Sequence, residues 1–298
     1  MENQFINTEQ TPPNYYKRRL TAIFIFAIFF IMLGRHLTFL PTVNLSMNTK
    51  EEDLQTEIEE LIKDRGGSFS IYYKNLENDN AFGIDANQIN TGASVNKLPI
   101  ISTLYLLDKE GKVSLDDRVT IQEDDVQDYG TGSIRYQEMP QTYSLRNLAK
   151  LALKESDNTA AHVIELKIGE ENVQKLVDIW GLKQTNMVEN QTTVYDMSIL
   201  LEKIYRGEIA DTANTNELLG FMTDTNFEDR LTKSLPKEAV VYHKTGDEEG
   251  FVHDVGLIKT DKGIYYLGVM TSDVGGREEE IKNVIAEISI KVYKSVNN

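Results

Sequence analysis

The chain begins with a polar segment that runs directly into a long apolar one. Residues 20–34 are apolar apart from Thr21, and residues 35–40 extend the run to about the 20 residues that a bilayer requires. Three basic residues at 17–19 precede it, and such residues keep the N-terminal end in the cytoplasm. The pattern predicts a cytoplasmic tail over 1–19, a transmembrane signal anchor over 20–40, a linker over 41–50 and an extracytoplasmic domain over 51–298.

A cleaved signal peptide has a similar charged flank and a similarly short apolar core. No small-x-small cleavage pattern follows Gly34, where the chain continues Arg-His-Leu-Thr-Phe-Leu. An uncleaved anchor is therefore favoured, which makes the cell membrane one expected partner and a single-pass location the expected one.

Beyond the linker, the spacing of apolar residues changes from element to element. Between 51 and 65 they recur every three or four positions, which is typical of an amphipathic helix, and a glycine pair at 66–67 ends it. Residues 68–73 and 81–85 have strand character and are joined by a polar turn. Residues 95–107 are almost all apolar, which predicts a helix buried on every side.

The middle of the chain, about 114–234, is mostly helical in pattern. Strand patterns return at 239–243, 251–259 and 263–271, and an amphipathic helix begins near 281. Strands joined by short turns pair antiparallel. The order predicts an α/β fold, in which a five-stranded antiparallel sheet is flanked by the terminal helices and an all-helical subdomain is inserted between its halves.

Composition narrows the range of partners. The formal net charge is −16, and because residues 1–40 carry four basic and two acidic side chains, the remainder carries −18. Such an acidic body repels polyanions, which argues against nucleic acid. The chain has no cysteine, and its four histidines show no metal-ligand spacing. We therefore expect neither a metal nor another cofactor.

The first candidate for chemistry is Ser94 with Lys97, at the start of the predicted buried helix. Lys97 lies three residues after Ser94, so it is one turn along and on the same face. Burial at the start of an apolar helix disfavours the charged form of a lysine, and a neutral amine can accept a proton from a serine hydroxyl. Taken alone, the pair also fits a helix N-cap followed by a surface lysine.

Two further strings follow in order. Ser156-Asp157-Asn158 lies between two apolar-periodic helices, and Lys244-Thr245-Gly246 ends a predicted strand. Each alone also fits ordinary helix capping or an exposed strand-end lysine. In this order after Ser-x-x-Lys, they are the signature of class A β-lactamases and penicillin-binding proteins.

Over residues 51–296 the chain resembles class A β-lactamases and other penicillin-recognising serine enzymes. Beyond the three motifs, the resemblance lies in Gly92–Pro99, Gly130–Ile134, Ser156–Ala161 and His253–Gly256. It implies that Ser94 is the nucleophile that forms an acyl-enzyme and that Lys97 accepts its proton. It further implies that Ser156 relays the proton to the leaving nitrogen and that Lys244 sets the protonation states of Lys97 and Ser156.

The same resemblance assigns substrate contacts to Asn158, Thr245, Gly246, Asp247 and Tyr129. Asn158 would hold the acyl amide and Thr245 a substrate carboxylate, while Gly246 would let the substrate lie along the strand as an added strand. The backbone N–H groups of the nucleophile and of Asp247 would form an oxyanion hole, and Tyr129 would stand in one wall. The expected substrates are β-lactams or cell-wall peptides.

The chain departs from the class A pattern in the element that activates the deacylating water. The Glu-x-x-Leu-Asn string that carries this general base is absent between Asn158 and Lys244. In the matching stretch, 187–193, Glu189 is the nearest carboxylate, and a solvated loop residue is the favoured interpretation. Loss of a positioned general base lowers a rate on the order of 10²–10⁴-fold, so fast acylation and slow deacylation are expected.

Three acids at 247–249 directly follow the third motif. They should weaken capture of a substrate carboxylate at low salt, and Arg277 is the residue that would compensate. The favoured function is a membrane-anchored extracytoplasmic serine hydrolase, with a D-Ala-D-Ala peptidase as the near alternative. A receptor that stays acylated is a third hypothesis, although a tail of about nineteen residues leaves little room for an intracellular output module.

Overall fold

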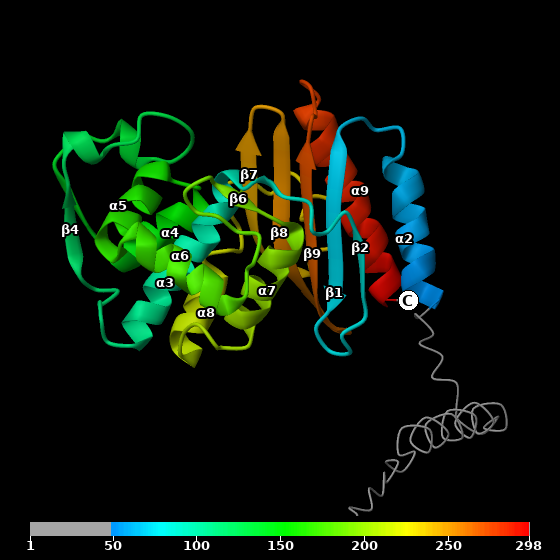
Figure 1. Ribbon diagram of the computed structural model, residues 1–298, viewed down its shortest axis with the longest axis horizontal. Helices are drawn as coiled ribbons and strands as arrows, with labels where there is room; N and C mark the ends of the chain where they lie inside the picture. The colour runs from blue at the N-terminus through cyan, green and yellow to red at the C-terminus, as the bar shows by residue number, and fades with distance from the viewer. Residues whose placement is uncertain (1–48, 298) are drawn as a thin grey trace, which may run out of the picture. The chain divides into compact units, whose positions relative to one another are not determined.

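The computed structural model describes residues 49–297, and its centre is one five-stranded sheet. The strand order is β2-β1-β9-β8-β7, and every neighbouring pair is antiparallel (Figure 1). The strands are β1 (Ser68–Asn75), β2 (Ala81–Ile84), β7 (Val240–Glu248), β8 (Phe251–Thr260) and β9 (Gly263–Ser272). The predicted sheet is therefore confirmed, and β7 forms the edge that borders the helical part of the domain.

Helices α2 (Thr49–Ile62) and α9 (Glu278–Asn297) lie together on one face of the sheet (Figure 1). Side chains alternate between the two faces of a strand, so Phe69 and Ile71 of β1 face these helices, whereas Tyr72 packs into the core on the other face. Alternation on β1 and β9 gives each sheet face its own apolar layer, and the two terminal helices cover one of them.

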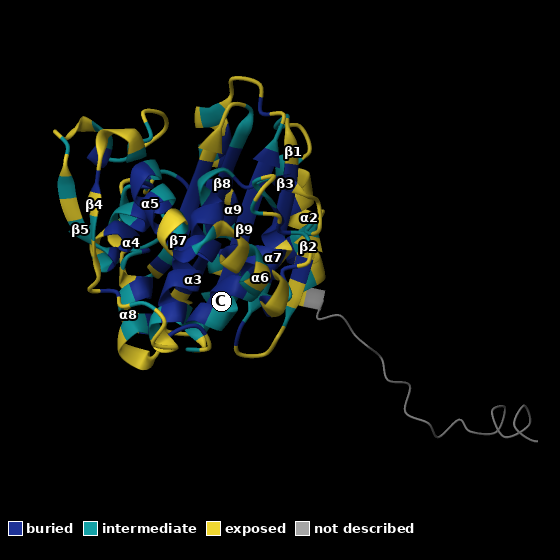
Figure 2. Ribbon diagram, turned by 60° about the vertical axis from the view of Figure 1, so that its left-hand side comes forward, coloured by how far each residue is buried: buried dark blue, intermediate teal, exposed yellow. Residues whose placement is uncertain are grey.

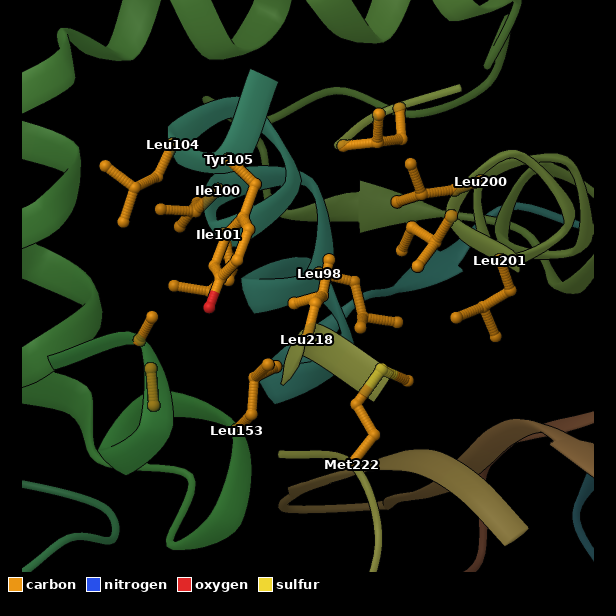
Figure 3. Packing of buried hydrophobic residues seen from close by; sticks show 14 of the residues in the cluster. Leu98, Ile100, Ile101, Leu104, Tyr105, Leu153, Leu200, Leu201, Leu218 and Met222 are labelled. Carbon is orange, nitrogen blue, oxygen red and sulfur yellow. The ribbon is translucent and has the colours of Figure 1, made fainter. Parts of the chain in front are cut away.

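The opposite face carries the helical part of the domain. Its helices are α3 (Lys97–Lys109), α4 (Leu145–Lys154), α5 (Asn158–Ile168), α6 (Glu170–Trp180), α7 (Val194–Tyr205) and α8 (Thr212–Gly220). Helix α3 runs through its centre, and Leu98, Ile101 and Leu104 are fully buried among the surrounding helices (Figure 3). The prediction of a helix buried on all sides is confirmed for α3.

The sequence pattern predicted an all-helical part over about 114–234. The inserted part differs from this prediction because it also contains short strands. Strands β4 (Arg118–Ile121) and β5 (Gln141–Ser144) form an antiparallel pair, and most of their residues are at least partly exposed (Figure 2). A second small sheet joins β3 (Asn90–Thr91) to β6 (Gln191–Thr192). These strands are too short for a clear period-two pattern. Helix α7 also packs directly against β1, β8 and β9.

Strand β7 extends beyond the predicted 239–243. Lys244, Thr245 and Gly246 lie inside the strand, which continues to Glu248 and pairs there with Phe251 of β8. The acidic residues after the motif look like a turn in the sequence, but the β7–β8 ladder holds the first two of them in strand conformation. The third motif is therefore fixed by backbone hydrogen bonds to β8.

No helix between residues 49 and 297 is long and apolar enough to cross a bilayer. The predicted cytoplasmic tail, signal anchor and most of the linker fall at 1–48, outside the described residues. The last two residues of the predicted linker belong to α2.

Candidate active site

Ser94 lies in η1 (Ala93–Asn96), a single 3₁₀ turn that leads directly into α3. The turn begins at Ala93 with φ 44°, a left-handed conformation that is uncommon for a residue with a side chain and that clusters at functional sites. Strand β7 packs closely against it: a Cβ on Gly246 would meet Val95 Cγ2 at 3.1 Å and the carbonyl oxygen of Gly92 at 3.2 Å. In this structure Gly246 thus lets β7 approach the turn that carries Ser94.

Lys97, the first residue of α3, points back toward Ser94. Its Nζ lies 2.9 Å from Ser94 Oγ, 3.1 Å from Ser156 Oγ and 2.6 Å from Asn158 Oδ1, and it also contacts the carbonyl oxygen of Ser156. The side chain is buried, with the whole residue only 6% exposed. Of the two interpretations of Ser94 and Lys97, the structure therefore contradicts the snorkelling surface lysine.

The second and third motifs meet at the hydroxyl of Ser156. Lys244 Nζ lies 3.0 Å from Ser156 Oγ and 2.9 Å from the carbonyl oxygen of Thr245. Ser156 has φ 55°, a left-handed conformation at the junction of α4 and α5 that aims its side chain between the two lysines. One hydroxyl thus lies within hydrogen-bonding distance of both amines.

The environment lowers the pKa of both lysines. Burial is the main cause of the low pKa of Lys97, and the nearby charge of Lys244 lowers it further, so this pKa lies well below the ordinary value. Burial, together with Arg230, lowers the pKa of Lys244 to about 7. The lowered pKa of Lys97 favours a neutral amine beside Ser94, and Lys244 keeps its charge on the acidic side of pH 7.

Asn158 and the loop before η3 (Ile134–Tyr136) form the next part of the site. Asn158 Nδ2 donates to the carbonyl oxygen of Tyr129 at 3.1 Å, and Thr131 Oγ1 donates to the carbonyl oxygen of Ser156 at 2.8 Å. Buried Asp157 accepts from the backbone N–H groups of Ile134 and Ala160, each at 2.9 Å. The residues of the second motif thus hold the loop before η3 in place and also form the start of α5.

These groups surround a cleft of about 580 Å³. Of the residues predicted from the sequence, those that line it are Ser94, Lys97, Tyr129, Ser156, Asn158, Thr245 and Asp247. Lys244 lies behind Ser156, and Gly246 lies under η1. The structure brings all the predicted residues to one cleft, although they come from four separate stretches of the chain.

Asp247 has a partner that the sequence did not indicate. Arg230 Nη1 and Nη2 donate to its two carboxylate oxygens at 2.8 and 3.0 Å, and the guanidinium is fully buried. Arg277, which we expected to compensate the acids, instead donates to the carbonyl oxygens of Val274 and Arg65 and does not line the cleft. A lone arginine in a loop gives no sequence pattern, so Arg230 was missed.

The loop between α6 and α7 supplies no carboxylate to the cleft. Its lining residues there are Met187 and Asn190, whereas Glu189 is exposed and does not line it. Asn190 ties the loop to η1, because its side chain accepts from Asn96 Nδ2 at 2.8 Å and its carbonyl accepts from Gly92 N–H at 2.6 Å. The preference for a solvated Glu189 agrees with this position.

Sequence reasoning also missed His162 and Glu165, which line the cleft from α5 together with Asn158. His162 lies four positions after Asn158, and Glu165 lies three positions after His162, so the three residues share one helical face. The signal was present as a polar stripe on an otherwise apolar helix. Among residues 49–297, no cluster of His, Asp and Glu could hold a metal ion.

A buried ion-pair cluster lies beneath the third motif. His243 is fully buried, with Nδ1 2.9 Å from Asp254 Oδ1 and Nε2 3.1 Å from Glu228 Oε1. Burial opposes the charge on His243, but the two carboxylates outweigh it and raise the pKa of the imidazole to about 9. The histidine is therefore charged at neutral pH and holds β7 to β8 and to the segment before β7.

Replacing His243 by Gln should remove stability that depends on pH. A raised pKa contributes stability that is complete below the unfolded-state value of 6.5 and is lost as the pH rises through about 9. The free energy of unfolding in urea should be higher for the wild type than for His243→Gln. This difference should be roughly 3 kcal/mol larger at pH 6 than at pH 9.5. A constant difference for His243→Gln would contradict the charged imidazole.

A serine beside a buried amine of lowered pKa, with a second hydroxyl between two lysines, is the arrangement expected of a serine acyl-transfer site. Residues 53–296 match the sequence model of the Beta-lactamase enzyme family, and the chain belongs to that family. Comparison with curated proteins gives no significant match.

Solved structures share the fold. PBP-A is 27% identical over 82% of this chain and 96% of its own, with a TM-score of 0.75. A mutant of PBP-A in an acyl-enzyme complex with penicillin G matches with a TM-score of 0.76 over 83% of this chain and 97% of its own, at the same 27% identity. A β-lactamase from Chitinophaga pinensis is 23% identical over 82% of this chain and all of its own, with a TM-score of 0.77. The predicted resemblance to penicillin-recognising serine enzymes is confirmed.

Proposed function

We propose that this protein is a serine hydrolase that forms an acyl-enzyme at Ser94 with β-lactams or related amides and releases the product slowly. The observation that carries the proposal is the position of the buried amine of Lys97, 2.9 Å from Ser94 Oγ and 3.1 Å from Ser156 Oγ. An amine with a lowered pKa in this position can take the serine proton as the nucleophile attacks.

Each proton in the proposed reaction has a defined path. Neutral Lys97 accepts the proton of Ser94 as Oγ bonds to the acyl carbon. The resulting ammonium gives a proton to Ser156 Oγ, which passes its own proton to the leaving nitrogen as the C–N bond breaks. The ammonium of Lys244, 3.0 Å from Ser156 Oγ, stabilises negative charge that develops on that oxygen during the relay.

Slow release is supported by the composition of the cleft. The α6–α7 loop contributes Met187 and Asn190 to it, and Glu189 lies outside. Because the α6–α7 loop supplies no base for the second step, a D-Ala-D-Ala peptidase acting on cell-wall peptides is the alternative function. The known acyl-enzyme of the PBP-A mutant with penicillin G makes penicillin G a suitable first probe.

The proposal includes attachment to the outer face of the cell membrane. It is supported by the basic residues at 17–19 followed by the apolar run over 20–40. Protease added to intact cells should digest the domain, and carbonate extraction should leave the full-length chain in the membrane fraction. Release of the chain by carbonate would contradict an anchor.

The function is tested by intact-mass spectrometry of the full-length protein mixed with penicillin G and, separately, with a chromogenic cephalosporin. We expect one covalent adduct per chain, located on Ser94 and absent from Ser94→Ala. Many rapid turnovers of the cephalosporin would support an efficient β-lactamase instead. A folded protein that gives no adduct with any acyl donor would overturn the enzyme assignment.

The acylation rate should depend on pH through both lysines. It should fall on the acid side as Lys97 takes up a proton, and it should fall about tenfold per unit above pH 7 as Lys244, with a pKa of about 7, loses its charge. Lys244→Arg keeps a permanent charge, so it should remove the alkaline decline even if its maximum rate is lower. Rates from intact mass between pH 5 and 10 check this, and an unchanged alkaline limb in Lys244→Arg would contradict the role of Lys244.

A further inference from the structure

The cleft wall is acidic. Its lining includes three carboxylates, Glu165, Asp247 and Glu248, and among the lining residues the only lysine is Lys97. Four acceptors surround the Lys97 amine: Ser94 Oγ, both oxygens of Ser156 and Asn158 Oδ1. Lys97 therefore has no free position from which to bind a substrate anion.

Arg230, which is bound to Asp247, cannot bind a substrate anion either. Arg230 uses Nη1 and Nη2 for Asp247, Nε for Asp229 at 2.8 Å, and Nη1 again for the carbonyl oxygen of His253 at 3.0 Å. Its side chain is 0% exposed. The resemblance places a substrate carboxylate at Thr245. Asp247 follows two residues later on the same strand, about 7 Å further along it. An anion bound at Thr245 meets a carboxylate that is already paired with Arg230, and the described lining of the cleft offers it no free lysine or arginine.

Glu165 is the acid that faces the acyl side of the cleft. It lies seven residues, or two turns, beyond Asn158 on the cleft-lining face of α5, which is about 10 Å along the helix axis. Among the described residues its carboxylate has no salt-bridge or hydrogen-bond partner. Burial and the charge of Glu170 raise its pKa, so a cation placed beside it would be stabilising.

We infer that the acyl donor of this cleft carries an ammonium group on its acyl portion, which pairs with Glu165. This rests on the proposed acyl transfer to Ser94. Asn158 would hold the acyl amide and Glu165 lies two helical turns further along α5, so the ammonium belongs to a basic side chain or to a terminal amine one or two residues from that amide. The substrate class is an amine-bearing peptide or amide.

The test uses three synthetic thioester donors with one neutral thiol leaving group, whose acyl chains have equal length and end in an ammonium, an acetamide or a carboxylate. Second-order rate constants for acylation of the full-length protein are measured by intact mass. We expect the ammonium donor to react roughly tenfold faster than the carboxylate donor at low salt, with the acetamide donor between them. The ratio should shrink as the ionic strength rises.

Variants assign the preference to Glu165. Glu165→Gln should bring the ammonium-to-carboxylate ratio close to one, and Glu165→Lys should invert it. Glu189→Gln, which removes an exposed loop charge outside the cleft, should keep the wild-type ratio. Equal rates for the three donors, or a preference retained in Glu165→Gln, would overturn the inference. If the acetamide donor itself gives no adduct on Ser94, the acyl transfer fails, which separates that outcome from a failure of charge selection.

Discussion

Replacing Lys97 by Met should reduce acylation of Ser94 by about 10²–10⁴-fold, the usual effect of removing a positioned proton acceptor. The free energy of unfolding should stay the same or rise, because the folded protein no longer has to bury an amine that is charged when unfolded. Because the pKa of Lys97 is lowered in the folded protein, this gain is complete below the folded-state pKa, shrinks as the pH rises above it and disappears near the unfolded-state value of 10.5.

The measurement combines intact-mass acylation rates with urea unfolding at several pH values. Lys150→Met, which removes an exposed lysine from α4, is the matched control and should alter neither quantity. If Lys97→Met acylates at the wild-type rate, another group takes the proton from Ser94. If it is less stable by several kcal/mol at pH 7, Lys97 is a charged structural residue instead.

The second large effect is the lifetime of the acyl-enzyme. Release should be slower than in an enzyme with a positioned base by on the order of 10²–10⁴-fold, because the α6–α7 loop places Met187 and Asn190, not a carboxylate, at the cleft. After excess penicillin G is removed, the adduct on Ser94 should persist and decline slowly in successive mass spectra of the full-length protein.

Glu189→Gln is the informative variant for release. The side chain of Glu189 is exposed and outside the cleft, so the lifetime of the adduct should be the same in the variant as in the wild type. Rapid loss of the adduct from the wild type would show that the cleft does activate water. A longer lifetime in Glu189→Gln would then identify Glu189 as the base, through a loop movement that brings it inward.

The interaction of Arg230 with Asp247 changes how the three acids after the third motif act on a substrate anion. Read from the sequence, 247–249 are three free charges close to the substrate. In the structure the first is neutralised by a fully buried guanidinium, and only the next, Glu248, both lines the cleft and lacks a described partner. The repulsion expected from three acids is therefore reduced, but the cation that would attract an anion is also occupied.

Hydrophobic periodicity predicted most strands of the main sheet and their antiparallel pairing, but not the short strands β3 to β6. Strands β1, β2, β8 and β9 fall within a residue or two of their predicted positions, because hydrophobic periodicity is a property of a few consecutive residues. The relation of Ser94 to Lys97 was also predictable, since three residues of helical turn fix their distance without help from the rest of the chain.

Which distant groups meet depends on the tertiary packing. Ser156 Oγ lies between Lys97 and Lys244, which are 59 residues before it and 88 residues after it, and this contact depends on how α5 docks on α3 and how β7 docks on η1. The Arg230–Asp247 pair and the position of Glu165 depend on the same packing. Periodicity and propensity contain no information on such contacts, because the energy that selects them comes from burial and charge pairing between segments far apart in the sequence.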